Sequence, residues 1–252
     1  MSKEKETTVD DVDPLAVPGD ASDLPAAWER PEGENLPAIP DKSAPLERSD
    51  FITPKLHLVQ RVGDLSVGFL QGSWVLNKEL QLTKEVGEPL NVIILEHPLK
   101  FFIEHLPFDP TGPRSRTFHT VEEVEAAGLS LEWDNKNNIR ATCDRAARVL
   151  LLILKPEALD SENGFGMTVE GIGPCAVASW LMVNTSYATA AKRIFTAEKL
   201  DLNGKSIYSL QWTLKSVPAK VGGYNIFAPQ IAPSKTLAEG ATSALKSMFN
   251  LA

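Results

Sequence analysis

Flat aromatic rings and positive charges recur close together between residues 100 and 224 of this chain. The residues concerned are Lys100, Phe102, Arg114, Arg116, Trp133, Arg140, Lys215, Lys220 and Tyr224. Cations bind the phosphate backbone of a single-stranded nucleic acid, and rings stack on its bases, each stack being worth roughly 1–3 kcal/mol. These residues are therefore candidates for nucleic-acid binding. The alternative is that most of the rings lie in the core, because a large sheet must bury its bulky side chains.

Catalytic motifs are weak by comparison. Gly204-Lys205-Ser206 ends like a phosphate-binding loop, but that pattern requires a glycine where Lys199 stands, so a turn is the better interpretation. Ser243 and Lys246 match a nucleophile motif only in their spacing, and they lie on the polar face of an expected helix. No set of acid, base and nucleophile can be assembled, so we expect no enzymatic activity and no cofactor.

Metal binding and export are also not expected. The histidines, His57, His97, His105 and His119, are not spaced like metal ligands from one another or from a cysteine. Cys143 and Cys175 are too few for a disulfide framework, and the N-terminus does not resemble a signal peptide. No apolar run approaches the roughly 20 residues of a membrane span. We therefore expect a cytoplasmic protein, in the host cytoplasm if it is viral.

Charge divides the chain into two parts. Residues 1–50 contain five Lys/Arg, thirteen Asp/Glu and seven of the eighteen prolines, so they carry the whole net charge of −8. Such a segment buries too little apolar surface to offset its ordering entropy, which predicts a disordered acidic, proline-rich arm. The arm is either a solubilising tail or a segment that docks on a basic surface, with residues 25–28 as its anchor. Residues 51–252 are neutral and should form one globular domain.

The stretch from 202 to 227 is the best-defined part of that domain. Tyr208, Leu210, Trp212 and Leu214 alternate with polar residues, which predicts a strand with one buried face. Asn203-Gly204 favours a tight hairpin turn before it, and Gly222-Gly223 favours another after it.

The remaining helices and strands are predicted from the periodicity of apolar residues and from the capping and turn residues between them. Strands are expected within 52–59, 65–70, 73–76, 90–96, 100–104, 129–133, 146–154 and 175–183, and the strands at 90–96 and 100–104 should pair with each other. Helices are expected at 120–128, with Thr120 and Glu123 as a capping box, at 185–200, and from Ser234 to Phe249. The fold class is α+β with a dominant antiparallel sheet, an OB-like barrel or sandwich with about three helices.

Several runs together resemble a loosely defined family of tailed-phage proteins that bind single-stranded DNA or assist replication. The runs are 54–60, 72–76, 120–128, 131–134, 185–191, 208–214 and 220–224, and the resemblance covers about 51–233. It implies an oligonucleotide-binding-like barrel, no enzymatic activity and work at the replication fork. An acidic arm that recruits replication proteins also suits this family, although there the arm is usually C-terminal.

The sequence therefore favours a non-catalytic, phage-type single-stranded-DNA-binding protein that acts in replication or recombination. The alternative is a virion structural or assembly protein with a disordered N-terminal arm, since a neutral β-rich domain suits that role as well. A small-molecule enzyme ranks third. An oligomer is possible under either of the first two hypotheses.

Overall fold

The computed structural model describes residues 52–106, 115–134, 136, 137, 139–160, 164–200, 202 and 204–251. The chain divides into two units, Met1–Phe51 and Ile52–Ala252, and the fold described below is that of the second. The arm expected at 1–50 lies outside the described residues, as does Arg114.

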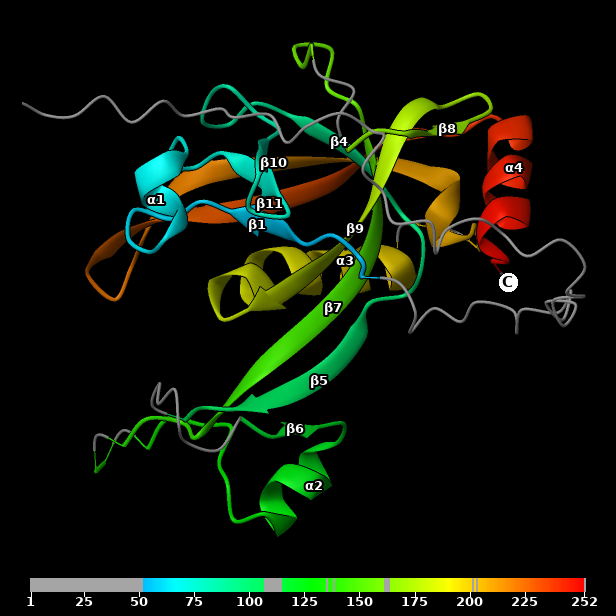
Figure 1. Cartoon of the computed structure of the whole chain (residues 1–252). Helices are drawn as coiled ribbons and strands as arrows, with labels where there is room; N and C mark the ends of the chain where they lie inside the picture. The colour runs from blue at the N-terminus through cyan, green and yellow to red at the C-terminus, as the bar shows by residue number, and fades with distance from the viewer. Residues whose placement is uncertain are drawn as a thin grey trace, which may run out of the picture. The chain divides into compact units, whose positions relative to one another are not determined.

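An eight-stranded antiparallel sheet forms the body of this domain (Figure 1). Its strands are β4 (Leu90–Ile94), β5 (Leu99–Glu104), β6 (Thr117–Phe118), β7 (Cys143–Leu154), β8 (Met167–Val169), β9 (Gly173–Val183), β10 (Leu210–Val221) and β11 (Tyr224–Thr236). The main order is β11-β10-β4-β7-β5-β6, while β9 pairs with the other edge of β7 and with β8. The long strand β7 is therefore the centre of the sheet.

The expected pairing between 90–96 and 100–104 is wrong. Both β4 and β5 pair with β7 instead, β4 along 151–153 and β5 along 143–148. They follow one edge of β7 in succession, because the short break at His97-Pro98 changes their register without reversing the chain. A tight turn would need residues that tolerate a positive φ, and this segment offers none.

A small second sheet contains β1 (Leu56–Leu58), β2 (Trp74–Leu76) and β3 (Leu80–Gln81). It lies between two edges of the main sheet. On one side, Ser179 of β9 donates its backbone N–H to Pro54 O over 2.8 Å. On the other side, the side-chain amide of Gln60 forms two hydrogen bonds with the backbone of Phe227. Gln60 Nε2 donates to Phe227 O over 2.9 Å, and Gln60 Oε1 accepts from the Phe227 N–H over 3.0 Å.

The α-helices are α1 (Leu65–Gly68), α2 (Val121–Ala126), α3 (Lys192–Leu200) and α4 (Glu239–Phe249), with a π-helical turn η3 (Tyr187–Ala191) and a 3-10 turn η4 (Ile207–Ser209). The expected strand at 65–70 is thus wrong, since it contains α1, and 129–133 forms no strand. The helices expected at 120–128 and 185–200 are confirmed. The last helix begins at Glu239 rather than Ser234, because β11 stays paired with β10 as far as Thr236.

The capping of α2 agrees with its sequence. Thr120 Oγ1 accepts a hydrogen bond from the Glu123 N–H over 3.2 Å, and Gly128 follows the helix with φ of 73°. The Glu123 carboxylate reaches back to the N–H of His119 over 2.7 Å, one residue before the capping residue.

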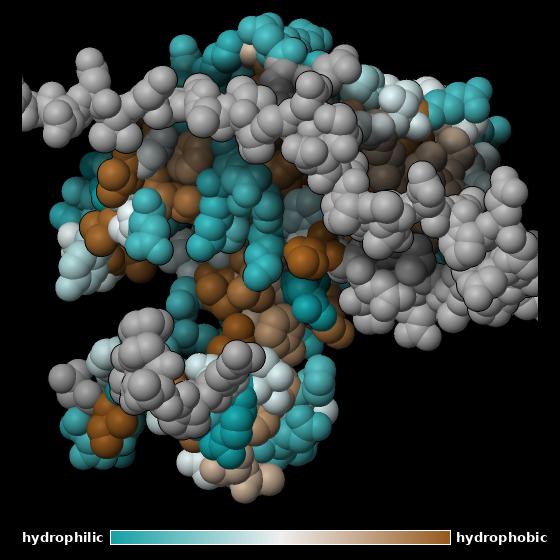
Figure 2. Space-filling model, viewed as in Figure 1, coloured by the Kyte–Doolittle hydropathy of each residue, from teal (hydrophilic) through white to brown (hydrophobic). Residues whose placement is uncertain are grey.

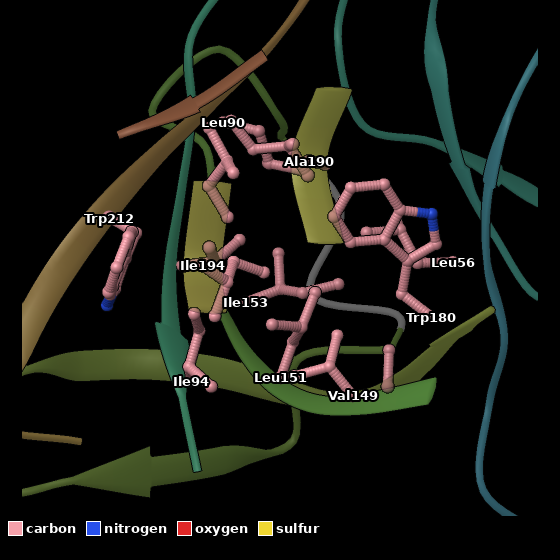
Figure 3. Close-up of a cluster of buried hydrophobic side chains, with 14 of the residues drawn as sticks. Leu56, Leu90, Ile94, Val149, Leu151, Ile153, Trp180, Ala190, Ile194 and Trp212 are labelled. Carbon is pink, nitrogen blue, oxygen red and sulfur yellow. The ribbon is translucent and has the colours of Figure 1, made fainter. Parts of the chain in front are cut away.

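The main core lies between the inner face of the sheet and α3 (Figure 3). Val149, Leu151 and Ile153 of β7 point into it, and Ile194 of α3 fills its centre. Leu210, Trp212 and Leu214 are buried there, as the expected alternation requires. The expectation is wrong for Tyr208, which lies in the turn η4 and packs in the second cluster, and for Gln211, which is also buried. The opposite, outer face of β7 is covered by α4 over its C-terminal half, where Leu152 and Leu245 share a second cluster.

The fold is therefore α+β with mainly antiparallel sheets and four α-helices, one more than expected. The described strands form an open sheet, so the barrel, one of the two expected arrangements, is not present among them. The small sheet and the Gln60 side chain join the edges that a barrel would close with a strand ladder. No helix in the described part of the chain is long and apolar enough to cross a membrane.

Candidate nucleic-acid interface

The hairpin of β10 and β11, here called the ribbon, carries an unusual charge distribution. From Leu202 to Ala238 the chain contains Lys205, Lys215, Lys220 and Lys235 but no Asp or Glu. The domain as a whole is neutral, so this stretch is positive because it lacks carboxylates, not because its lysines are unusually dense. The lysines of such a stretch attract a polyanion, and none of its own side chains repels it. The nearest exception is Glu239 of α4, which lines the same hollow as Lys205.

The ribbon extends beyond the rest of the sheet. β4 pairs only with 211–214 of β10, while β10 and β11 continue together to the turn at Gly222 and Gly223, which have φ of 55° and 87°. This confirms the turn expected at these two glycines. The expected hairpin at Asn203-Gly204 is wrong, because helix α3 precedes it rather than a strand. The turn there, closed by Lys205 N–H to Leu202 O over 2.8 Å, joins a helix to the ribbon.

Three of the expected site residues project from the ribbon. Lys215 and Lys220 are exposed, and the Tyr224 side chain is 77% exposed at the turn. The register places Lys215 opposite Gln230 and Val221 opposite Tyr224, so Lys215 and Tyr224 lie on one face and Lys220 on the other. The ring of Tyr224 is therefore free of the core and able to stack on a base.

The outer edge of the ribbon is protected against pairing with another strand. The N–H and C=O of Phe227 point away from β10, because both bond the Gln60 amide. Alternation along β11 places the ring nitrogens of Pro229 and Pro233 on the same outward edge, where proline costs no ladder hydrogen bond. The side chains of the ribbon, rather than its backbone edge, are thus its available binding groups.

An open pocket of about 540 Å³ borders the ribbon. It is lined by Thr189, Arg193, Thr213, Lys215, Gln230, Ile231 and Ala232. Arg193 of α3 and Lys215 of β10 thus supply two cations to one hollow, together with two threonine hydroxyls and an amide. Sequence reasoning missed Arg193. Its only signal was a position on the polar side of a helix whose Ile194 and Ala197 are buried.

The other expected residues lie at the opposite end of the sheet, near β5, β6 and α2 (Figure 1). Phe102 is 1% exposed and packs against Val124 and Cys143, so the expectation that it stacks on bases is wrong. Lys100 is exposed, and its Nζ lies 5.4 Å from the centre of the Phe102 ring.

Arg116 is already occupied by a carboxylate. Its Nε and Nη2 donate to the two oxygens of Glu104 over 2.8 and 2.9 Å. This bidentate bond lowers the pKa of Glu104 and raises the pKa of Arg116. The guanidinium carbon also lies 5.5 Å from the centre of the Phe118 ring. A phosphate would have to compete with Glu104, which weakens Arg116 as a binding residue.

Trp133 and Arg140 are both exposed in the segment between α2 and β7. Arg140 Nη2 lies 3.8 Å from an oxygen of Asp144, so its charge is partly balanced. The structure does not bring these two residues next to Lys215, Lys220 or Tyr224, because β4 and β7 separate the two ends of the sheet. Carboxylates therefore neutralise Lys215 and Lys220 of the ribbon less than they neutralise Arg116 and Arg140 at the opposite end of the sheet.

The histidines and cysteines of the described residues lie in separate environments. No group of three His, Cys, Asp or Glu side chains there could hold a metal ion. His97 pairs with Glu198 over 2.9 Å, and His105 lies 3.9 Å from Asp144, so these two histidines have separate partners. Both cysteines are buried, and burial raises the pKa of Cys175 to about 11, which makes it a poor nucleophile.

Comparison with known proteins adds no relative: no family model, no curated protein and no solved structure matches this chain.

Proposed function

We propose that this chain is a non-catalytic single-stranded-DNA-binding protein that binds DNA along the β10–β11 ribbon. The observation that carries the proposal is the run from Leu202 to Ala238, with four lysines, no carboxylate and an exposed tyrosine at the turn. The lysines provide contacts for phosphates, and Tyr224 provides a stacking surface for an unpaired base. A duplex keeps its bases stacked inside, so single strands are the preferred ligand.

The phage-type role in replication or recombination, in the cytoplasm of a host, belongs to the same proposal and rests on the resemblance of the sequence. The proposal keeps the oligonucleotide-binding role of an OB-like fold but assigns it to a two-stranded ribbon rather than to a barrel. Replication proteins are the partners we propose for the acidic residues at 1–50.

The test is a fluorescence-anisotropy titration of labelled single-stranded and double-stranded oligonucleotides with the full chain, at several salt concentrations. Lys215→Gln and Lys220→Gln should each lower the slope of log affinity against log salt by about 0.7, because each removes one phosphate contact to a single strand. Tyr224→Ala should cost about 1–3 kcal/mol of binding, the worth of one stacked base.

The matched control is Lys246→Gln, which removes one exposed positive charge from α4, outside the ribbon. It should leave the salt slope unchanged. If the full chain binds no single strand at low salt, or if the control weakens binding as much as the ribbon variants, the proposal fails.

The alternative, a virion structural or assembly protein, is favoured by one feature. Leu99 and Leu181 are exposed on the outer face of β5 and β9, and an assembly protein needs such a surface to contact its own copies.

A further inference from the structure

Exposed apolar side chains lie at several places in the described domain, including the ribbon turn and the segment around Trp133, and two other places stand out. One is α1 and its flanks, where Val62 and Val67 are almost fully exposed and Figure 2 shows hydrophobic residues at the surface. The other is the outer face of β5, β7 and β9, where Leu99 and Leu181 are 47% and 48% exposed. The second place also carries a charge pattern that indicates a specific partner.

The outer face of these strands follows from their register. Leu99, Arg148 and Leu181 stand side by side on the three strands, in that order, so an arginine lies between two exposed leucines. The next row on this face is Phe101, Ala146 and Val183, and the row after it pairs Ile103 with Asp144. We call these eight residues the outer patch. All of them but Arg148 and Asp144 are apolar.

The charges of the outer patch are arranged symmetrically. Arg148 and Asp144 lie two residues on either side of Ala146 along β7, and both point to the same face, because side chains two apart share a face. Arg148 is exposed and Asp144 is partly exposed. Ala146 itself is buried between its neighbours, so the larger side chains around it, such as Leu99 and Leu181, provide the contact surface.

We infer that the outer patch binds the outer patch of a second copy of this chain, with a two-fold axis that crosses β7 above Ala146. This axis lies in the plane of the interface, at right angles to the strands. It places Arg148 of each copy opposite Asp144 of the other, and it places Leu99 opposite Ile103. The two sheets then stack face to face, about 10 Å apart, with antiparallel β7 strands.

Other orientations are less favourable. A two-fold axis parallel to β7 would place Arg148 opposite Arg148 and Asp144 opposite Asp144, which puts like charges together. Arg140 Nη2 and His105 Nδ1 lie 3.8 and 3.9 Å from the same oxygen of Asp144, Oδ2, so Arg148 of the second copy would approach the other oxygen, Oδ1. The charge pattern therefore selects a single arrangement of the two copies.

The dimer should be weak. The patch has eight residues on three strands, fewer than the roughly 20–30 residues per side of a standard interface, so we expect association only at concentrations of about 100 µM or more. Sedimentation equilibrium on the full chain without DNA, over a concentration series reaching about 1 mM, should show a reversible monomer–dimer equilibrium. A chain that stays monomeric throughout overturns the inference.

Charge-swap variants test the arrangement itself. Arg148→Asp and Asp144→Lys should each weaken self-association by about tenfold or more, because each places like charges opposite one another twice in the dimer. An equimolar mixture of the two variants should associate again, since both pairs then have opposite charges. Circular dichroism checks that each variant is folded. A mixture that associates no better than its components overturns the proposed axis.

An apolar variant and its control test the location. Leu181→Glu should abolish the dimer, whereas Leu200→Glu, on an exposed leucine at the end of α3, should leave it intact. Equal effects of the two changes would show that the dimer uses another surface and would overturn the inference. The result does not depend on DNA binding by the ribbon, because no DNA is present and the ribbon lysines are unchanged.

Discussion

Single residues connect the ribbon to the small sheet. Ser216 of β10 is buried, its hydroxyl donates to the backbone oxygen of Gly72, and it accepts the N–H of Gly87 over 3.3 Å. Gly72 has φ of 83°, and a Cβ at this position would lie 2.8 Å from Cε1 of Phe227. The ribbon can therefore pack against the small sheet only because residue 72 has no side chain.

Gly72→Ala should destabilise the fold by about 2–4 kcal/mol, because it combines an unfavourable backbone conformation with a steric clash against Phe227. The free energy of unfolding in urea measures this effect. Gly68→Ala is the matched control: no heavy atom lies within 4 Å of its added Cβ, and its φ is not positive, so stability should stay the same or rise by up to about 1 kcal/mol. Equal midpoints for wild type and Gly72→Ala would show that the contact is not tight.

At the scale of elements, the main sheet remains open, and Gln60 substitutes for a missing strand pairing. Its amide oxygen accepts from the Phe227 N–H, and its amide nitrogen donates to the Phe227 carbonyl, as a neighbouring strand would. Two backbone groups at the edge of β11 are thereby satisfied. The link also holds the segment after β1 beside the ribbon.

Gln60→Ala should lower the free energy of unfolding by about 1–3 kcal/mol, since it removes two hydrogen bonds at a partly buried edge. Amide hydrogen exchange should also show faster exchange at Phe227. Gln71→Ala, at an exposed glutamine, should change stability by less than about 0.5 kcal/mol. Unchanged protection of the Phe227 amide in the Gln60 variant would contradict this role.

At the scale of the whole molecule, charge is divided between two parts of the chain. The net charge of −8 resides entirely in residues 1–50, while the four lysines of the ribbon region have no carboxylate among them. If the domain binds a polyanion as proposed, the acidic residues of the same chain should compete with it, and more strongly at low salt, where screening is weak.

Deletion of residues 1–50 should therefore strengthen binding to single-stranded oligonucleotides, with the largest gain at low salt. The anisotropy titration described above measures this directly on the full chain and the shortened one. A gain that persists unchanged at high salt would show that the acidic charges are not its cause, and weaker binding after deletion would contradict the competition.

Local features of this protein could be predicted from the sequence because they depend on neighbours in the chain. The burial of Leu210, Trp212 and Leu214, the cap at Thr120 and the turn at Gly222-Gly223 are confirmed, and each follows from side-chain period or backbone freedom within a few residues. The charge division at residue 50 is likewise a property of composition alone.

Only the tertiary structure decided which distant segments meet. The pairing of β4 and β5 with β7, the burial of Phe102 under α2 and the position of Arg193 beside Lys215 depend on contacts between residues far apart in the chain. Period-two alternation shows that one face of a strand is apolar and the other polar. It does not specify which strand pairs with it or which elements pack against each face. Many pairings satisfy the same local pattern, and the packing of the whole domain selects one of them.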